Sequence, residues 1–320
     1  MKGRTLFKLF FLIAFLRMIH ANKERGALPS LIRDVRDIYG SSSLSLKFLY
    51  LSGAFLITCG IFHSFIFLSS KSSWEGPLSW RKPIIFAVSG GVTNLSVGWV
   101  VHLLSKSCSS SLSQLLESAF CVTFALCMSL EVFIITMQTW RRVPSHFNQK
   151  TEFDAKMFGL MGVLIGVVSL QIFLLNFLSF FLPANSFTRS AQYGISLLSL
   201  GCILGFVITS VAFSNLQKGE STTRYKRKGI LKFPHGLPLH AVQFLPIQTW
   251  LMNYSAVPLQ KGNLLLDLSA LGFLLATIYG IVQTFSGKAR FEASAFLMSI
   301  FILSIFLIFL PFFFSPFSQK

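Results

Sequence analysis

The sequence is poor in charged residues, and acidic residues are the scarcest. Only 12% of its 320 residues are charged, and 11 Asp and Glu stand against 28 Lys and Arg. Soluble domains contain about 25% charged residues, so this composition excludes a soluble enzyme of this size. A disordered chain is excluded as well, because it requires low hydrophobicity, whereas 53% of these residues are hydrophobic.

The sequence also lacks the short motifs of several functional classes. The five cysteines form no C-x-x-C pair and no zinc-type cluster with histidine, so neither a disulfide framework nor a structural zinc site is expected. The absence of C-x-x-C-H excludes covalently attached haem. The hydrolase motifs G-x-S-x-G and H-E-x-x-H are absent too. No nucleic-acid recognition motif is present, so we expect no nucleic-acid partner despite the net charge of +17.

Long hydrophobic runs are what the sequence has in abundance. A membrane-spanning helix needs about 20 mainly apolar residues. Eight runs meet this requirement, and they predict an all-α, polytopic transmembrane helical bundle. The expected main spans are residues 48–69, 84–104, 115–138, 157–182, 190–215, 237–255, 263–285 and 292–314.

The first 47 residues are expected to form a separate region, followed by a transmembrane domain at residues 48–320. Lys8 and Arg17 interrupt the apolar run at residues 6–19. This run is therefore either a cleaved signal peptide, a short uncleaved span or a helix on the membrane surface. Residues 31–38 have amphipathic spacing, which favours a helix that lies along the membrane surface.

Basic residues are distributed unevenly over the predicted loops. Each even-numbered loop contains one, namely Lys106, Arg189 or Lys261. The odd-numbered loops contain most of the others, so the positive-inside rule places these loops in the cytoplasm. Residues 20–47 then lie outside despite their five basic residues, and a ninth, short span with Lys2 and Arg4 inside would reconcile this. We also expect the basic residues to contact anionic lipid headgroups. The odd-numbered loops are residues 70–83, 139–156, 216–236 and 286–291.

Two pairs of glycines have the spacing of close helix contacts. Gly162 and Gly166 lie four residues apart on one helix face, as do Gly201 and Gly205. Small residues at this spacing let helix backbones approach each other. Both pairs therefore predict contacts inside the bundle.

Three segments in or beside the odd-numbered loops are unusual. Residues 80–83 read W-x-K-P, residues 145–148 read S-H-F-N, and residues 240–246 read H-A-x-Q-x-L-P. In this order, the segments resemble a family of uncharacterised bacterial multi-pass inner-membrane proteins, from about residue 48 to the final span. The resemblance implies a location in the bacterial cytoplasmic (inner) membrane, and it implies no activity.

These loops have a structural and a functional interpretation. In the structural one, Trp80 anchors the chain at the membrane surface, Arg81 and Lys82 bind lipid phosphate, and Thr151 with Asp154 begins a helix. In the functional one, the loops meet on the cytoplasmic face and form one pocket. The side chains supplied to this pocket would be Glu75, Arg81, Lys82, Arg141, Arg142, His146, His235 and His240.

Glu131 is the first candidate for a functional residue within the membrane. An ionisable group at depth costs at least ~2.5–3.5 kcal/mol on insertion scales, so it needs a partner or a role. Its carboxyl is either a neutral acid bonded to another helix, a proton carrier, or the binder of a cationic or hydroxyl-bearing ligand. Gln138 lies on the same face, toward the second unusual loop. Glu117, Asp267 and Glu292 lie near span ends, where we expect them to reach headgroups.

The sixth predicted span contains a second polar face. His240 and Gln243 are three residues apart, and Pro246 is expected to kink the helix and free a carbonyl beside them. His63 and Asn94 are predicted near mid-depth in other spans. His240 is a possible partner of Glu131 in one polar cavity that opens to the cytoplasm.

Three functions fit these features. The first is transport or ligand binding through the polar cavity, lined by Glu131, Asn94, His240 and Gln243. The second is a membrane-embedded enzyme or redox protein, in which His63 and His240 are weak candidates as ligands of non-covalent haem. The third is an assembly or scaffold component whose basic loops dock an unidentified protein. The sequence assigns no cofactor and no reaction.

Overall fold

The computed structural model describes residues 27–314 except 71, 77 and 108–109. The chain divides into two compact units. Unit 1 contains residues up to Gly40 and from Pro183 onward, and unit 2 runs from Ser41 to Leu182. The predicted N-terminal run at residues 6–19 lies outside the described residues, and the expected boundary at residue 47 stays a prediction.

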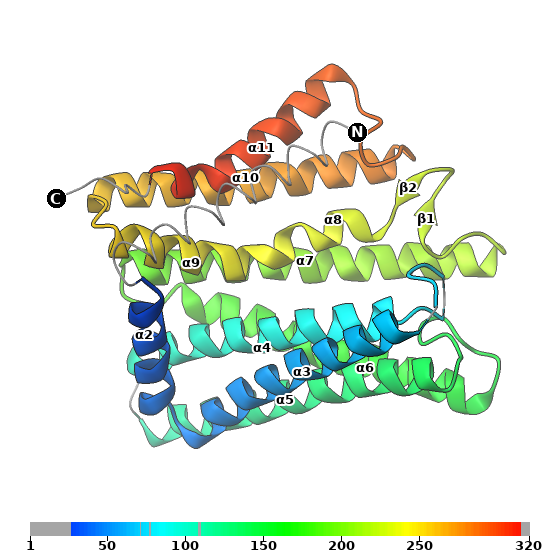
Figure 1. Cartoon of the computed structure of the whole chain (residues 1–320), viewed down its shortest axis with the longest axis horizontal. Helices are drawn as coiled ribbons and strands as arrows, with labels where there is room; N and C mark the ends of the chain where they lie inside the picture. Colours follow the sequence, from blue (N-terminus) through cyan, green and yellow to red (C-terminus); the bar gives the residue numbers. More distant parts are fainter. Residues whose placement is uncertain (1–26, 71, 77, 108–109, 315–320) are drawn as a thin grey trace. The chain divides into compact units, whose positions relative to one another are not determined.

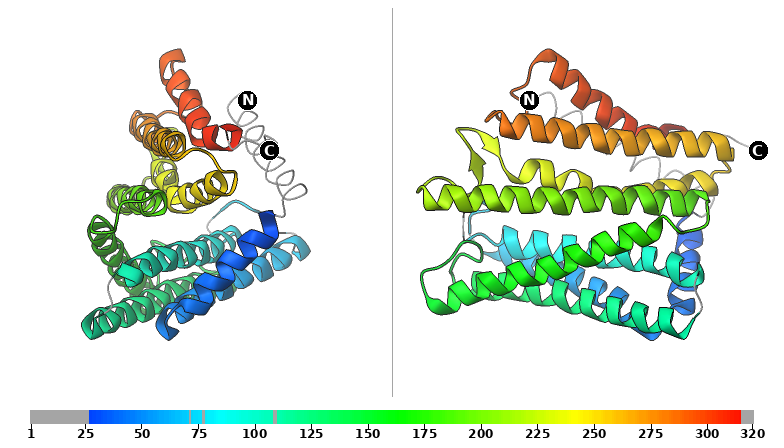
Figure 2. Two further views of the ribbon diagram at one scale, coloured as in Figure 1. Left: turned by 90° about the vertical axis from the view of Figure 1, so that its left-hand side faces the viewer. Right: turned by 180° about the vertical axis from the view of Figure 1, so that it is seen from behind.

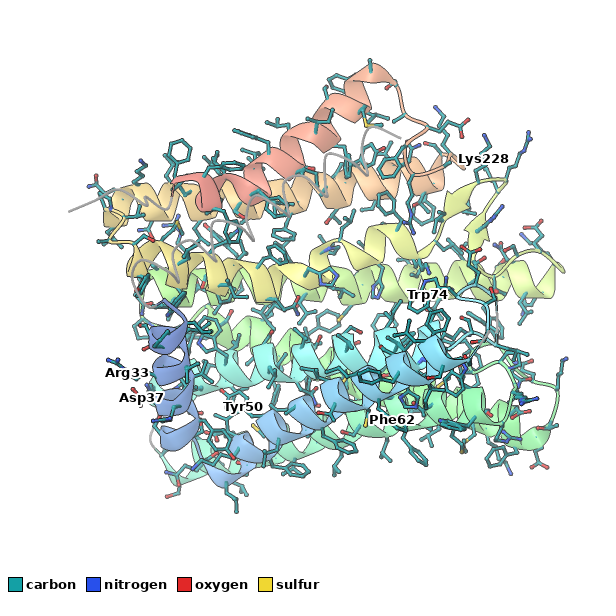
Figure 3. All side chains as sticks on the ribbon, in the orientation of Figure 1. Arg33, Asp37, Tyr50, Phe62, Trp74 and Lys228 are labelled. Carbon is teal, nitrogen blue, oxygen red and sulfur yellow. The ribbon has the colours of Figure 1, made fainter. Side chains whose placement is uncertain are left out.

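Within the described part of the chain, seven helices are long and apolar enough to cross a membrane. This confirms the all-α transmembrane bundle, and the chain is a multi-pass membrane protein. Large apolar side chains project from these helices, as for Phe62, which is 57% exposed and labelled in Figure 3. The helices are α3 (Leu44–Ser69), α4 (Arg81–Ser107), α5 (Ser111–Trp140), α6 (Glu152–Ser179), α7 (Ser186–Gln217), α10 (Leu259–Phe285) and α11 (Ala295–Phe314).

The expected span at residues 237–255 is the one that differs. This region is divided into α8 (Lys232–Gly236), the 3-10 helix η1 (Pro238–His240) and α9 (Ala241–Tyr254). Proline donates no backbone hydrogen bond and glycine favours other conformations, so the alternation of Pro234, Gly236 and Pro238 interrupts the helix. With 14 residues, α9 is about 21 Å long, which is less than the ~30 Å hydrocarbon core. The predicted span count was therefore one too high for these residues. The helix is interrupted before His240, whereas Pro246 lies inside α9.

In unit 2, helices α3 to α6 lie side by side (Figure 1). The approach of α3 to α4 is close because both contribute glycine. A Cβ on Gly53 would lie 2.8 Å from the carbonyl oxygen of Gly91, and one on Gly91 would lie 2.5 Å from that of Gly53. Thr151 caps α6 by accepting the backbone N–H of Asp154 at 3.1 Å, as the sequence predicts.

In unit 1, α7 packs against α8, η1 and α9, and α11 lies obliquely across α10 (Figure 2). Two short antiparallel strands, β1 (Arg224–Tyr225) and β2 (Gly229–Ile230), dock on the end of α10, where the Thr284 hydroxyl donates to the carbonyl of Ile230 at 3.2 Å. The amphipathic segment is confirmed as a helix, α2 (Ala27–Ser41), and its Asp34 carboxylate accepts from the Trp250 indole at 2.7 Å.

The two glycine pairs have different roles. Gly201 and Gly205 on α7 allow close packing of the interrupted helix. A Cβ on Gly201 would lie 2.6 Å from the Leu239 side chain, and one on Gly205 would lie 3.1 Å from the His235 ring. This confirms the predicted close contact. The prediction is wrong for Gly162 and Gly166, where an added Cβ would meet no heavy atom within 4 Å.

Candidate functional site

Glu131 lies on a buried face of α5 and is 7% exposed. Within the described residues, no hydrogen bond or ion pair to its carboxyl is formed. Gly90 of α4 packs beside Met128 and Val132, which places Glu131 at the level of Gly90 in unit 2. An ionisable side chain is thus held inside a span without a partner in the described part of the chain.

Asn94 lies one turn further along α4, about 6 Å from the level of Gly90. Its side-chain nitrogen donates to the Ser52 hydroxyl on α3 at 2.9 Å. Its side-chain oxygen is buried and has no hydrogen-bond partner among the described residues. Asn94 and Glu131 therefore both present oxygen acceptors that the surrounding helices leave unused.

Gln138, seven residues after Glu131 on the same face, takes part in a buried polar network at the end of α5. Its side-chain nitrogen donates to Oδ1 of Asp154 at 3.0 Å. The Arg141 guanidinium donates to the same oxygen at 2.7 Å, and the Thr151 hydroxyl donates to Oδ2 at 2.9 Å. This network joins the end of α5 to the start of α6. Asp154 was expected only as a helix-starting residue, and its role in this network could not be inferred from local spacing.

A second polar group lies where the α5–α6 loop meets the start of α4. Lys82 Nζ donates to the Ser145 hydroxyl at 3.5 Å, and this hydroxyl lies 2.9 Å from Nδ1 of His146. Burial, together with the Lys82 charge, lowers the pKa of His146 to about 4. His146 is therefore neutral near pH 7. Arg81, in the first turn of α4, is half-buried.

His63, six residues before the end of α3, lies beside Trp80, which precedes α4, and beside Trp140, the last residue of α5. Its Nδ1 is hydrogen-bonded to the Cys59 carbonyl at 2.7 Å, and its Nε2 accepts from the Trp140 indole at 3.3 Å. Its ring lies 5.9 Å from that of Trp80, centre to centre. Both ring nitrogens are engaged, so this arrangement gives no support to His63 as a haem ligand.

His240 and Gln243 belong to unit 1, whereas Glu131 and Asn94 belong to unit 2. His240 is exposed at the end of η1. With its amide nitrogen turned toward the backbone, Gln243 donates to the carbonyls of Leu239 and His240 at 3.1 and 3.2 Å. The cavity shared by all these residues stays a prediction.

The acidic residues near span ends have protein partners that sequence reasoning missed. Both oxygens of Glu117 accept from serine hydroxyls, one from Ser43 and one from Ser105. The Asp267 carboxylate pairs with the Arg189 guanidinium at 2.8 Å, and Glu292 pairs with Lys228 at 2.8 Å. Partner choice depends on how the helices pair, and no local motif carries that information.

No protein-family model, no curated protein and no solved structure matches this chain.

Proposed function

We propose that the protein is a transporter or ligand-binding membrane protein, in which the Glu131 carboxyl carries a proton or binds a cationic or hydroxyl-bearing ligand. The observation that carries this proposal is the burial of Glu131 inside α5 without a hydrogen-bonding or ionic partner in the described chain. Such groups within membranes are costly and usually mark ion, proton or substrate sites.

The unused groups in the interior of unit 2 define the chemistry of the ligand. The carboxylate of Glu131 and the side-chain oxygen of Asn94 are both acceptors. A buried acceptor requires a donor, and a buried anion requires a cation or a proton. An ammonium, a hydroxyl or a proton satisfies this requirement, whereas an anionic ligand would add repulsion.

Gln138 supports a path toward one end of the bundle. It lies two turns from Glu131 on the same face and contacts the Arg141–Asp154 pair. We propose that this end faces the cytoplasm in a bacterial inner membrane, because it carries the basic residues of an odd-numbered loop.

Proton movement across proteoliposomes tests the role of Glu131. A pH-sensitive dye inside the vesicles reports how fast an imposed proton gradient collapses. Wild-type protein should collapse the gradient faster than empty vesicles, and Glu131→Gln should reduce the rate to that of empty vesicles. The matched control is Glu152→Gln, which removes an exposed carboxyl at the start of α6. Equal rates in wild type and Glu131→Gln would exclude Glu131 as a proton carrier.

A further inference from the structure

Among the described residues of unit 2, the buried donors of Ser79 and Asn148 lack an acceptor. Ser79 is 3% exposed and Asn148 is 4% exposed. The Ser79 hydroxyl and the side-chain nitrogen of Asn148 have no hydrogen-bond partner in the part of the chain that the structure describes. The Asn148 oxygen accepts the backbone N–H of Lys150 at 3.2 Å, so its nitrogen is the unused end. Buried polar groups are nearly always paired, and an exception indicates a missing partner.

Both donors lie in segments that meet at the contact between Lys82 and Ser145. Ser79 is one turn before Lys82, and its carbonyl accepts the Lys82 backbone N–H at 3.4 Å. Asn148 is three residues after Ser145, whose hydroxyl accepts from Lys82 Nζ at 3.5 Å. The donors and the ammonium group are therefore gathered in one small region at the end of unit 2.

The α5–α6 loop reaches this region in an unfavourable backbone conformation. Arg142 has φ 57° and Phe147 has φ 56°, in the left-handed region that residues with a side chain rarely adopt. The two residues flank the segment that contains Ser145 and His146. Strain of this kind persists where the surroundings hold it in place, and it is concentrated at binding and active sites.

The charge of the region favours an anion. Arg81 and Lys82 lie in the first turn of α4, and Arg142 is exposed on the loop. The nearby Asp154 carboxylate is already neutralised by Arg141 at 2.7 Å. Lys82 Nζ lies 3.5 Å from the Ser145 hydroxyl, so a positive charge lies directly beside these donors.

We propose that Ser79, Lys82, Ser145 and Asn148 form a binding site for a phosphate group. Phosphate oxygens accept hydrogen bonds from hydroxyl, amide and ammonium donors, the three kinds present here. The site lies beside the ends of α3 and α5 and the starts of α4 and α6, where the chain leaves the membrane-spanning helices. The phosphate belongs either to a phospholipid headgroup or to a free phosphate ion. This inference does not depend on Glu131, which lies deeper in the bundle.

Thermal unfolding of the full chain in a phosphate-free, uncharged detergent tests the site. Inorganic phosphate is titrated in one series and phosphatidylglycerol in a second, with diacylglycerol as the lipid control that lacks phosphate. A ligand that binds only the folded protein raises the unfolding temperature in proportion to its binding. Asn148→Asp replaces the unused donor with an acceptor and should weaken binding about tenfold or more, as loss of a charge-assisted contact does.

Two further variants separate binding from folding. Ser79→Ala removes the other donor without a change of charge, and it should weaken binding if Asn148→Asp fails to fold. Gln149→Glu is the matched control, because it adds the same charge at the neighbouring exposed position and keeps both donors. An effect of phosphate identifies a free ion, and an effect of phosphatidylglycerol alone identifies a headgroup. The proposal is overturned if neither ligand distinguishes wild type from Asn148→Asp and Ser79→Ala.

Discussion

Gln138 joins two helices through a single buried amide. Gln138→Leu keeps the volume but leaves Asp154 without one of its donors, and we expect the free energy of unfolding to fall by about 1–2 kcal/mol. Gln114→Leu on the exposed face of the same helix is the control and should change it little. Denaturant titration of both variants in detergent measures the difference. Equal stabilities would show that the Gln138–Asp154 contact contributes nothing.

His146 gives the loop a pH dependence with a defined sign. Its pKa is about 4 in the folded protein and about 6.5 in the unfolded chain. Between these values the unfolded chain binds more protons, so the stability that neutral His146 provides is lost as pH falls from about 6.5 to 4.

The unfolding temperature of wild type should therefore fall over this window relative to that of His146→Gln, and the difference should level off below pH 4. Lys82→Met should move the lower limit of the window upward, because it removes a charge that disfavours protonation. Parallel pH profiles for wild type and His146→Gln would contradict this assignment.

For single residues, the sequence predicted which side chains share a helix face but not which residues they bond to. The spacing of Glu131 and Gln138 on one helix follows from the helical repeat, and burial of that face agrees with it. The partners Asp154 and Ser145 are brought in by the reversal of the chain between α5 and α6. The unpaired donors Ser79 and Asn148 were missed for the same reason, since pairing depends on packing.

The elements of unit 1 are organised around the broken helix. Gly194 of α7 faces the backbone of α9, and a Cβ there would lie 2.8 Å from the Cα of Val242. Gly194→Ala should lower the free energy of unfolding by about 1–3 kcal/mol, as overpacking does, because backbone cannot move aside like a flexible side chain.

Gly162→Ala is the matched substitution in an open position. It should raise the free energy of unfolding by about 0.5–1 kcal/mol, since alanine is the better helix former. Chemical denaturation of the two variants beside wild type measures both changes. If both destabilise equally, the contact between α7 and α9 does not control stability.

Hydropathy found seven of the membrane helices because long apolar runs have few other stable structures in a bilayer. It failed at residues 237–255 because counting apolar residues ignores where backbone donors are missing. Pro234, Gly236 and Pro238 were the available signal. Gly162 shows a second limit of sequence reasoning. Small residues at this spacing allow a close contact between helices but do not require one.

For the whole molecule, the distribution of basic residues predicts which loops face the cytoplasm. Single cysteines at Ser72, Gln149 and Thr222, in a background without the native cysteines, should be protected from a membrane-impermeant maleimide in intact cells. A cysteine at Gln260, exposed at the start of α10 in an even-numbered region, should be labelled. Labelling of the first three with protection of Gln260 would invert the orientation.

The central claim concerns Glu131, a carboxyl inside a membrane helix to which the described part of the chain provides no hydrogen-bonding or ionic partner. Infrared spectroscopy of purified protein reports the carbonyl stretch of a protonated carboxylic acid directly. We predict a band of this kind in wild type that disappears in Glu131→Gln, remains in Glu152→Gln, and changes when pH is varied. Identical spectra for wild type and Glu131→Gln would contradict the account.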